Sequence, residues 1–191
     1  MNKKTKDSIR YFSSLVGNSI YLREVQLSDV NDNYFHWMTD PEITQYLESR
    51  FFPISKSYLQ NYVKEKREDE NSVFFSIILK ENHHHIGNIK LGPIDWIHRL
   101  SDIGIIIGEK ECFGKGYATE AIGLLIEYAF NILNLHKLTA GCYAKNKGTE
   151  RAFTKNGFKI EGIRKKHLFF KGRYTDAVDM GLINKKDRYD E

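Results

Sequence analysis

The chain has 191 residues, of which 41% are hydrophobic and 28% are charged. These values are ordinary for one globular domain, and they exclude a low-complexity, collagen-like or coiled-coil chain. The net charge of +4 is well short of the strongly basic character of a nucleic-acid-binding domain. A mildly basic surface favours an anionic ligand, such as a cofactor that carries phosphate groups.

Cysteine content and apolar runs indicate the compartment. The two cysteines, Cys112 and Cys142, cannot form a disulfide framework, which fits a reducing cytoplasm. The longest apolar stretches, residues 103–107 and 121–130, are too short to span a bilayer. The positively charged N-terminus lacks the apolar core of a signal peptide. We therefore expect a cytoplasmic protein that does not enter a membrane.

The first half of the chain predicts strands and helices in alternation. Residues 19–25 alternate polar and apolar side chains, as a strand does. Residues 28–39 predict a helix that ends before Asp40-Pro41, because the residue before a proline disfavours the helical conformation. Residues 55–69 predict a second helix. Two strands joined by a polar turn follow at residues 73–79 and 85–91.

The second half begins with a strand at residues 102–107, whose apolar, β-branched side chains predict burial on both faces. Residues 116–133 repeat apolar side chains at helical spacing and predict the clearest helix. The remaining elements are a strand at 137–143, a helix at 148–155, and strands at 158–169 and 173–182.

The order of these elements predicts an α/β domain with a mixed sheet of about seven strands flanked by about four helices. No Pro- or Ser-rich linker divides the chain. We expect one domain over residues 18–186, with an N-terminal extension of residues 1–17 and a C-terminal tail of residues 187–191.

A glycine-containing loop joins the strand at 102–107 to the clearest helix. It reads Phe113-Gly114-Lys115-Gly116-Tyr117-Ala118. Glycine lets main-chain amides approach a ligand closely, and the helix N-terminus adds unpaired N–H groups and a positive dipole. The loop is therefore a candidate anion site. Its spacing fits neither a P-loop nor the GxGxxG dinucleotide fingerprint, which would need a glycine in place of Thr119.

Two runs carry a family likeness: FGKGYATEAI and, about thirty residues later, NKGTERAFTKNGF. Together they resemble the GNAT superfamily of acyl-CoA N-acetyltransferases. The opening IYLREVQLSDV and the closing KGRYTDAVDMGLI are similar to the branch that contains ribosomal-protein N-terminal acetyltransferases and amino-sugar acetyltransferases. The resemblance spans residues 19–184, and it implies the GNAT fold with acetyl-CoA as co-substrate.

The resemblance also implies where CoA binds. Main-chain amides of the glycine loop would hold the pyrophosphate, the pantetheine arm would run beside the preceding strand, and Asn146 would contact that arm. The implied cofactor-binding residues are Ile105, Ile106, Ile107, Phe113, Gly114, Lys115, Gly116, Tyr117, Ala118, Thr119 and Asn146. One departure is Phe153, which stands where many members of the superfamily have a tyrosine as general acid.

The implied reaction is direct acetyl transfer from a thioester to a neutral primary amine. Asp102 begins the predicted central strand and His98 lies just before it, so either could accept a proton, directly or through water. Both also fit purely structural roles. Tyr143 ends the next strand, near the expected position of the thiol, where aromatic packing explains it equally well.

The resemblance implies an acceptor pocket around the second helix, with Arg50, Phe51 and Trp37 as candidate acceptor-binding residues. Arg50 is the candidate to bind an acceptor phosphate. Resemblance in the segment IGNIKLGPIDWIHRLSDIGIIIG favours a nucleotide-linked amino sugar as acceptor. The alternatives are a protein N-terminus or a polyamine, and a CoA-binding module without catalysis. The expected partner is a small-molecule amine, without nucleic acid, and the protein is expected to be a monomer or homodimer.

Two other features do not indicate a site. The adjacent residues His83, His84 and His85 fall near a predicted turn, and neighbouring side chains of an extended chain point to opposite sides and chelate one ion poorly. Cys112 has no evident His or Asp relay and does not fit a nucleophile. We expect no metal.

Overall fold

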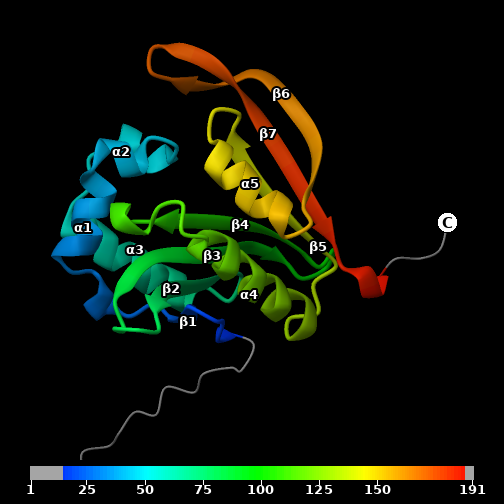
Figure 1. The fold of residues 1–191 in the computed structure, drawn as a ribbon, viewed down its shortest axis with the longest axis horizontal. Helices are drawn as coiled ribbons and strands as arrows, with labels where there is room; N and C mark the ends of the chain where they lie inside the picture. Colours follow the sequence, from blue (N-terminus) through cyan, green and yellow to red (C-terminus); the bar gives the residue numbers. More distant parts are fainter. Residues whose placement is uncertain (1–14, 188–191) are drawn as a thin grey trace, which may run out of the picture.

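Residues 15–187 are described by the structure, a computed structural model. One seven-stranded sheet has the order β1-β2-β3-β4-β5-β7-β6 (Figure 1). Neighbouring strands are antiparallel, except that β4 and β5 are parallel. The predicted α/β fold with a mixed sheet is confirmed. The strands are β1 (Ile20–Glu24), β2 (Val73–Leu79), β3 (His85–Asp95), β4 (Leu100–Ile107), β5 (Lys137–Tyr143), β6 (Lys159–Phe170) and β7 (Arg173–Ile183).

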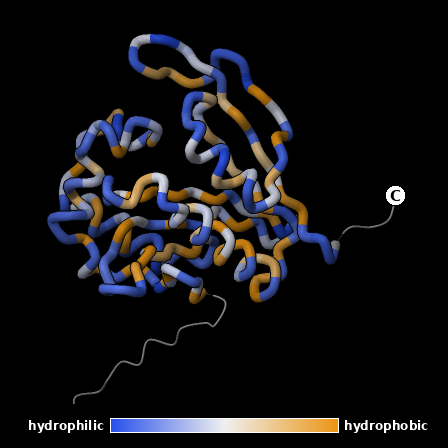
Figure 2. The backbone as a smooth tube through the Cα atoms, viewed as in Figure 1, coloured by the Kyte–Doolittle hydropathy of each residue, from blue (hydrophilic) through white to orange (hydrophobic). Residues whose placement is uncertain are grey.

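Helices cover both faces of the sheet (Figure 1). The main hydrophobic core lies between one face and the helices α4 (Tyr117–Asn131) and α5 (Lys147–Lys155). A smaller core on the other face joins β2 to α1 (Asp32–Thr39) and α3 (Lys56–Glu68). Figure 2 shows hydrophobic residues concentrated in the strands and polar residues on the outer surface.

The predicted helix over residues 28–39 begins later than expected. The side chain of Asn31 accepts a hydrogen bond from the Tyr34 amide, which fixes the start of α1. Residues 27–29 form a separate 3-10 turn, η2. A short helix that was not predicted, α2 (Pro41–Thr44), follows, because Asp40 caps it and Pro41 suits its first position.

The prediction that the strand at 102–107 is buried on both faces is wrong. In β4, Gly104 is exposed, and the side chains of Ile105, Ile106 and Ile107 are only half-buried. Six of the seven residues of β2 are buried, so β2 has the environment that was expected for β4. The apolar side chains of β4 are exposed because the sheet opens beside them, as described below.

The folded unit includes residues that were predicted to belong to the N-terminal extension. The Leu15 side chain is 2% exposed and packs in the main core, and Val16 forms an isolated β-bridge with Tyr21. Residues 1–14 and 188–191, which make up most of the predicted extension and tail, lie outside the described residues.

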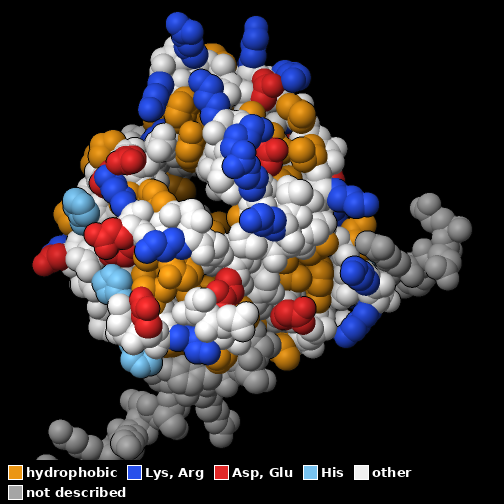
Figure 3. Space-filling view, in the orientation of Figure 1, with side chains coloured by type: hydrophobic (Ala, Val, Ile, Leu, Met, Phe, Trp, Pro, Cys, Tyr) orange, Lys and Arg blue, Asp and Glu red, His pale blue; other side chains and the backbone are white. Residues whose placement is uncertain are grey.

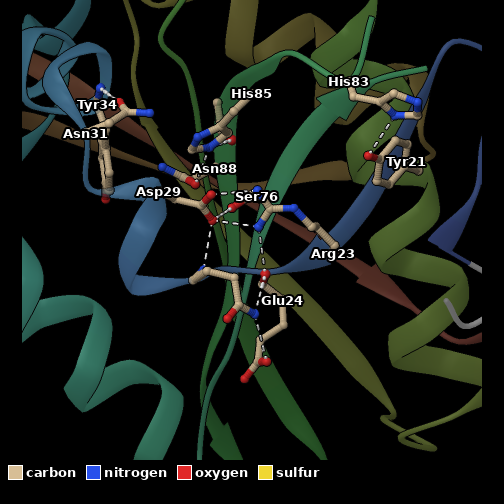
Figure 4. A network of polar contacts seen from close by, with 12 residues as sticks. Tyr21, Arg23, Glu24, Asp29, Asn31, Tyr34, Ser76, His83, His85 and Asn88 are labelled. Carbon is tan, nitrogen blue, oxygen red and sulfur yellow. Dashed lines mark hydrogen bonds and ion pairs between the residues drawn. The ribbon is translucent and has the colours of Figure 1, made fainter. Parts of the chain in front are cut away.

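A buried carboxylate ties β1 and β2 to the turn before α1 (Figure 4). Both oxygens of Asp29 accept hydrogen bonds of 2.6 Å from the Arg23 guanidinium, and Oδ2 also accepts from the Ser76 hydroxyl and the Gln26 amide. Burial alone would raise the pKa of Asp29, but these hydrogen bonds and the Arg23 charge outweigh it and lower the pKa.

We expect Asp29→Ala to lower the free energy of unfolding by about 3–5 kcal/mol at neutral pH, because it removes the carboxylate that compensates a largely buried arginine. The folded-state pKa of Asp29 lies below its ordinary value, so its contribution is present at neutral pH and is lost as the pH falls through the folded-state pKa. Urea unfolding of both proteins at pH 7 and pH 3 measures the difference.

The matched control is Glu161→Ala, which removes a partly exposed ion pair with Lys137. It is expected to cost less than about 1 kcal/mol. An Asp29 variant no less stable than this control, or equally destabilised at both pH values, would contradict the assigned role.

Candidate functional site

The sheet opens between β4 and β5. β4 pairs with β3 over most of its length, up to Ile107 opposite Gly87. It pairs with β5 at three positions only, from Leu100 opposite Lys137 to Asp102 opposite Thr139. Beyond Asp102, β5 continues to pair with β7 but no longer with β4. The edge of β4 over residues 103–107 is therefore available to an extended ligand.

A cleft of about 780 Å³ occupies this opening, within the range of small-molecule sites. Figure 3 shows the surface hollowed there, between the part that carries α2 and the part that carries α5. One wall is residues 42–48 without Thr44, which we call the acceptor wall. The residues of β4 and β5 that line the cleft are Ile103, Gly104, Ile105, Ile106, Ile107, Gly141, Cys142 and Tyr143.

The glycine loop lies at the end of the cleft where β4 ends. Gly114 and Gly116 have φ angles of +73° and +90°, which residues with a side chain rarely adopt. Gly116 is the N-cap residue of α4, and the first turn of that helix faces the cleft through Tyr117, Ala118 and Thr119. The helix N-terminus therefore offers main-chain N–H groups to an anion.

The loop fits a phosphate-bearing ligand by shape as well as by charge. A Cβ atom built at Gly114 or Gly116 meets no atom within 4 Å, so both glycines border open space. Since neither glycine needs to be small for packing within the protein, their absent side chains leave room for a ligand over the amides. This supports the predicted CoA site at this loop.

The sequence profile of the Acetyltransferase (GNAT) domain matches residues 19–159. The chain belongs to the GNAT acetyltransferase family. It is therefore an acetyl-CoA-dependent N-acetyltransferase.

Relatives of this GNAT protein cover most of its length. An uncharacterized N-acetyltransferase p20 of Bacillus licheniformis is 28% identical over 91% of this chain and 97% of the relative. A spermidine N(1)-acetyltransferase of Vibrio cholerae is 36% identical over 53% of this chain and 58% of the relative. A crystal structure of spermidine N-acetyltransferase from Vibrio cholerae, in complex with CoA and spermine, superimposes with a TM-score of 0.78 at 27% identity, and covers 87% of this chain and 96% of that one.

Two of the three remaining residues of the predicted CoA site, Phe113 and Asn146, line the cleft. Asn146 lines it and caps α5, accepting a hydrogen bond from the Thr149 amide. Phe113, the first residue of the loop, is exposed, and Lys115 is exposed on the loop outside the cleft lining. Phe153 lines the cleft but is only 1% exposed, and its ring packs edge-on against Phe158.

Of the three predicted catalytic residues, Tyr143 lines the cleft. It is 4% exposed, its hydroxyl donates a hydrogen bond of 2.7 Å to Glu48 on the acceptor wall, and the hydroxyl accepts one of 2.9 Å from Arg50. Burial and the Glu48 hydrogen bond raise the pKa of Tyr143, while Arg50 opposes them. Glu48 was not predicted.

Asp102 lies at the last position where β4 and β5 pair, and it accepts a hydrogen bond from the Thr139 hydroxyl. Burial raises the pKa of Asp102, against the lowering effects of Thr139 and Lys90. Asp102 is nevertheless exposed and is not among the residues that line the cleft, so a role as proton acceptor would require a connecting water. His98 lies in the turn between β3 and β4, at the end of β4 far from the glycine loop, and does not line the cleft.

None of the three residues predicted to bind the acceptor lines the cleft. Trp37 is 2% exposed and packs in the smaller core. The Arg50 guanidinium is engaged by the Leu47 and Phe169 carbonyls as well as the Tyr143 hydroxyl, and it lies over the exposed ring of Phe51. Arg50 therefore holds the acceptor wall against β5 and the β6–β7 hairpin.

The histidine run does not assemble a metal site. His85 begins β3 and is partly buried, with Nε2 close to the Gly87 carbonyl and the Asn88 side chain. His83 and His84 lie in the turn before it. Within residues 15–187 there is no group of three His, Cys, Asp or Glu residues that could hold a metal ion. No helix in the same range is long and apolar enough to cross a membrane.

Proposed function

We propose that the protein acetylates a primary amino group of a flexible polyamine such as spermidine. The observation that carries this proposal is the separation of charge across the cleft. The acceptor wall carries no lysine or arginine; its Glu42 is paired with Lys110, so Glu48 is the carboxylate that an acceptor would meet. A cationic amine is attracted to such a wall, and the diphosphate of a nucleotide sugar is repelled by it.

The cations of the cleft lie on its other side. Arg151 and Lys155 belong to α5, whose C-terminal end is held beside the first turn of α4 by the hydrogen bond from Asn156 to the Thr119 carbonyl. They are therefore placed for the phosphates of CoA. Arg164, on β6, is paired bidentately with Asp179.

Aromatic rings next to Glu48 also suit an alkylammonium group. Tyr46 and Tyr143 both line the cleft, and their ring centroids lie 5.6 Å apart. Aromatic faces attract cations, and together with a carboxylate they form a favourable environment for ammonium ions. The similarity to spermidine acetyltransferases supports the same class of acceptor.

The expectation of a nucleotide-linked amino sugar came from resemblance in residues 86–108, with Arg50 as the candidate to bind its phosphate groups. The hydrogen-bond donors of Arg50 are instead directed at two carbonyl groups and the Tyr143 hydroxyl. We therefore place the polyamine first. We further propose that Asp102 accepts the proton of the attacking ammonium group. Removing this proton from an alkylammonium group at pH 7 costs roughly 4–5 kcal/mol.

The test is release of CoA from acetyl-CoA with a panel of amines: spermidine, a 4-amino nucleotide sugar, an aminoglycoside and an N-terminal peptide. We expect the highest kcat/KM with spermidine, rising about tenfold per pH unit between pH 7 and 9 as the neutral amine becomes available. A higher kcat/KM with the nucleotide sugar would restore the original expectation. CoA binding without turnover of any amine would contradict the proposed acceptor class.

A further inference from the structure

The segment that leads from β4 into the glycine loop, residues 108–110, is held by the helices on the acceptor side. We call it the lead-in segment. Trp37 of α1 lies directly against Gly108: a Cβ atom built at Gly108 would be 1.9 Å from Cδ2 of the indole ring. The glycine is therefore required for this packing, in contrast to the two glycines of the loop.

Two polar contacts extend this packing along the lead-in segment. The indole Nε1 of Trp37 donates a hydrogen bond of 3.1 Å to Oε1 of Glu109. The ammonium group of Lys110 lies 2.9 Å from Oδ2 of Asp40 and 2.6 Å from Oε2 of Glu42. Asp40 caps α2, and Glu42 belongs to the acceptor wall. Consecutive residues of the lead-in segment are thus tied to α1 and then to α2.

Backbone hydrogen bonds connect the lead-in segment to the glycine loop, so the position of the segment determines the position of the loop. The amides of Gly108 and Glu109 both donate to the Ile86 carbonyl, which anchors the segment to β3. The carbonyls of Glu109 and Lys110 accept from the amides of Cys112 and Phe113, and the loop begins at Phe113. A shift of Lys110 therefore moves the amides that face the phosphate site.

We propose that Trp37 and Lys110 are positioning residues for acetyl-CoA: by tying the lead-in segment to α1 and α2, they fix the distance between the acceptor wall and the amides of the glycine loop. Affinity for a ligand decreases when its binding site is present in only a fraction of the molecules. Loosening either contact is thus expected to weaken CoA binding, although neither side chain belongs to the loop.

The decisive variant is Glu42→Gln, because two explanations predict opposite results. If Lys110 acted only as a nearby positive charge, removal of its carboxylate partner would strengthen CoA binding. If Lys110 holds the loop through Glu42, the same change weakens it. Glu42 is largely exposed, so the substitution is compatible with folding. We expect the Kd for CoA, measured by calorimetric titration, to rise about fivefold.

Lys110→Met is expected to raise the Kd for CoA about tenfold. The double variant Lys110→Met, Glu42→Gln is expected to have the same Kd as Lys110→Met alone, because both substitutions remove the same ion pair. Trp37→Phe, which retains a ring against Gly108 but loses the N–H donor, is expected to raise the Kd as well. The matched control is Lys56→Met, which breaks the ion pair with Asp32 at the opposite end of α1. Its Kd should equal that of the wild type.

This titration needs no acceptor, so it tests the positioning role even if the proposed polyamine specificity fails. Tighter or unchanged CoA binding by Glu42→Gln would overturn the inference. Equal weakening by Lys56→Met would also overturn it, since the effect would then follow from any loosening of α1. Melting temperatures of the variants, expected within a few degrees of the wild type, separate lost affinity from unfolding.

Discussion

Replacing Gly116 by alanine is expected to raise the Kd for CoA by about 100-fold. The new Cβ would project into the open space over the N-terminus of α4, where the phosphate groups approach the amides. Loss of one or two charge-assisted hydrogen bonds, at about 1.5–3 kcal/mol each, accounts for a change of this size. Calorimetric titration with CoA measures it.

The substitution also forces alanine into the left-handed region, at a cost of roughly 1–2 kcal/mol in folding free energy. Gly172→Ala is the control for this strain. Gly172 has a φ of +80° in the turn between β6 and β7, and a Cβ there also meets open space. Both variants should lose similar thermal stability, and only Gly116→Ala should lose CoA affinity. Normal CoA binding by Gly116→Ala would place the phosphates elsewhere.

Glu48→Gln is expected to lower kcat/KM for spermidine by about 30-fold, mainly through a higher KM. The carboxylate is oriented toward the cleft by the Tyr143 hydroxyl, and loss of an ion pair with an ammonium group is worth about 2 kcal/mol. An interaction made equally in the ground state and the transition state changes KM and leaves kcat in place. Initial rates at saturating acetyl-CoA provide both constants.

Two comparisons sharpen this experiment. Glu127→Gln removes a carboxylate from the exposed side of α4, outside the cleft lining, and should leave both constants unchanged. With n-butylamine, which has no second ammonium group, the Glu48 variant should lose much less activity than with spermidine. An equal loss with both amines would show that Glu48 does not recognise a distal ammonium group.

The candidate anion site could be located from the sequence because it is built from consecutive residues. The loop from Phe113 to Ala118 carries its own information: glycines that permit unusual backbone angles, followed at once by a helix N-terminus. The end of the preceding strand is adjacent in the chain and in space. The local pattern therefore predicts where an anion binds, whereas the choice of CoA came from the family resemblance.

The acceptor wall could not be predicted in the same way. Glu48 meets Tyr143, which is 95 positions away, and Trp37 meets Glu109, 72 positions away. Neither pair is marked by periodicity or spacing in the sequence, because each contact depends on how α1 and α2 pack against the end of the sheet. The sequence made Arg50 a candidate to bind an acceptor phosphate, but it could not indicate that carbonyl groups of the protein use the guanidinium donors.

The expectation of a doubly buried β4 failed for a related reason. An apolar, β-branched run predicts that a strand is removed from solvent, but it does not predict whether protein or a ligand covers the strand. Here the neighbour of Ile105 and Ile106 on one side is the cleft and not another strand. Residues 103–107 are apolar because they suit both the core and an organic ligand.

The three-position contact between β4 and β5 divides the sheet into two parts with few bonds between them. Strands β1–β4 form one part, and β5, β7 and β6 form the other. An extended molecule that enters the gap does not disrupt any existing strand pair. It can form hydrogen bonds along the edge of β4 that has no neighbouring strand. Ligand binding then connects the two parts of the sheet along the gap between β4 and β5. We therefore expect the two parts to twist relative to each other less in the bound enzyme than in the free enzyme.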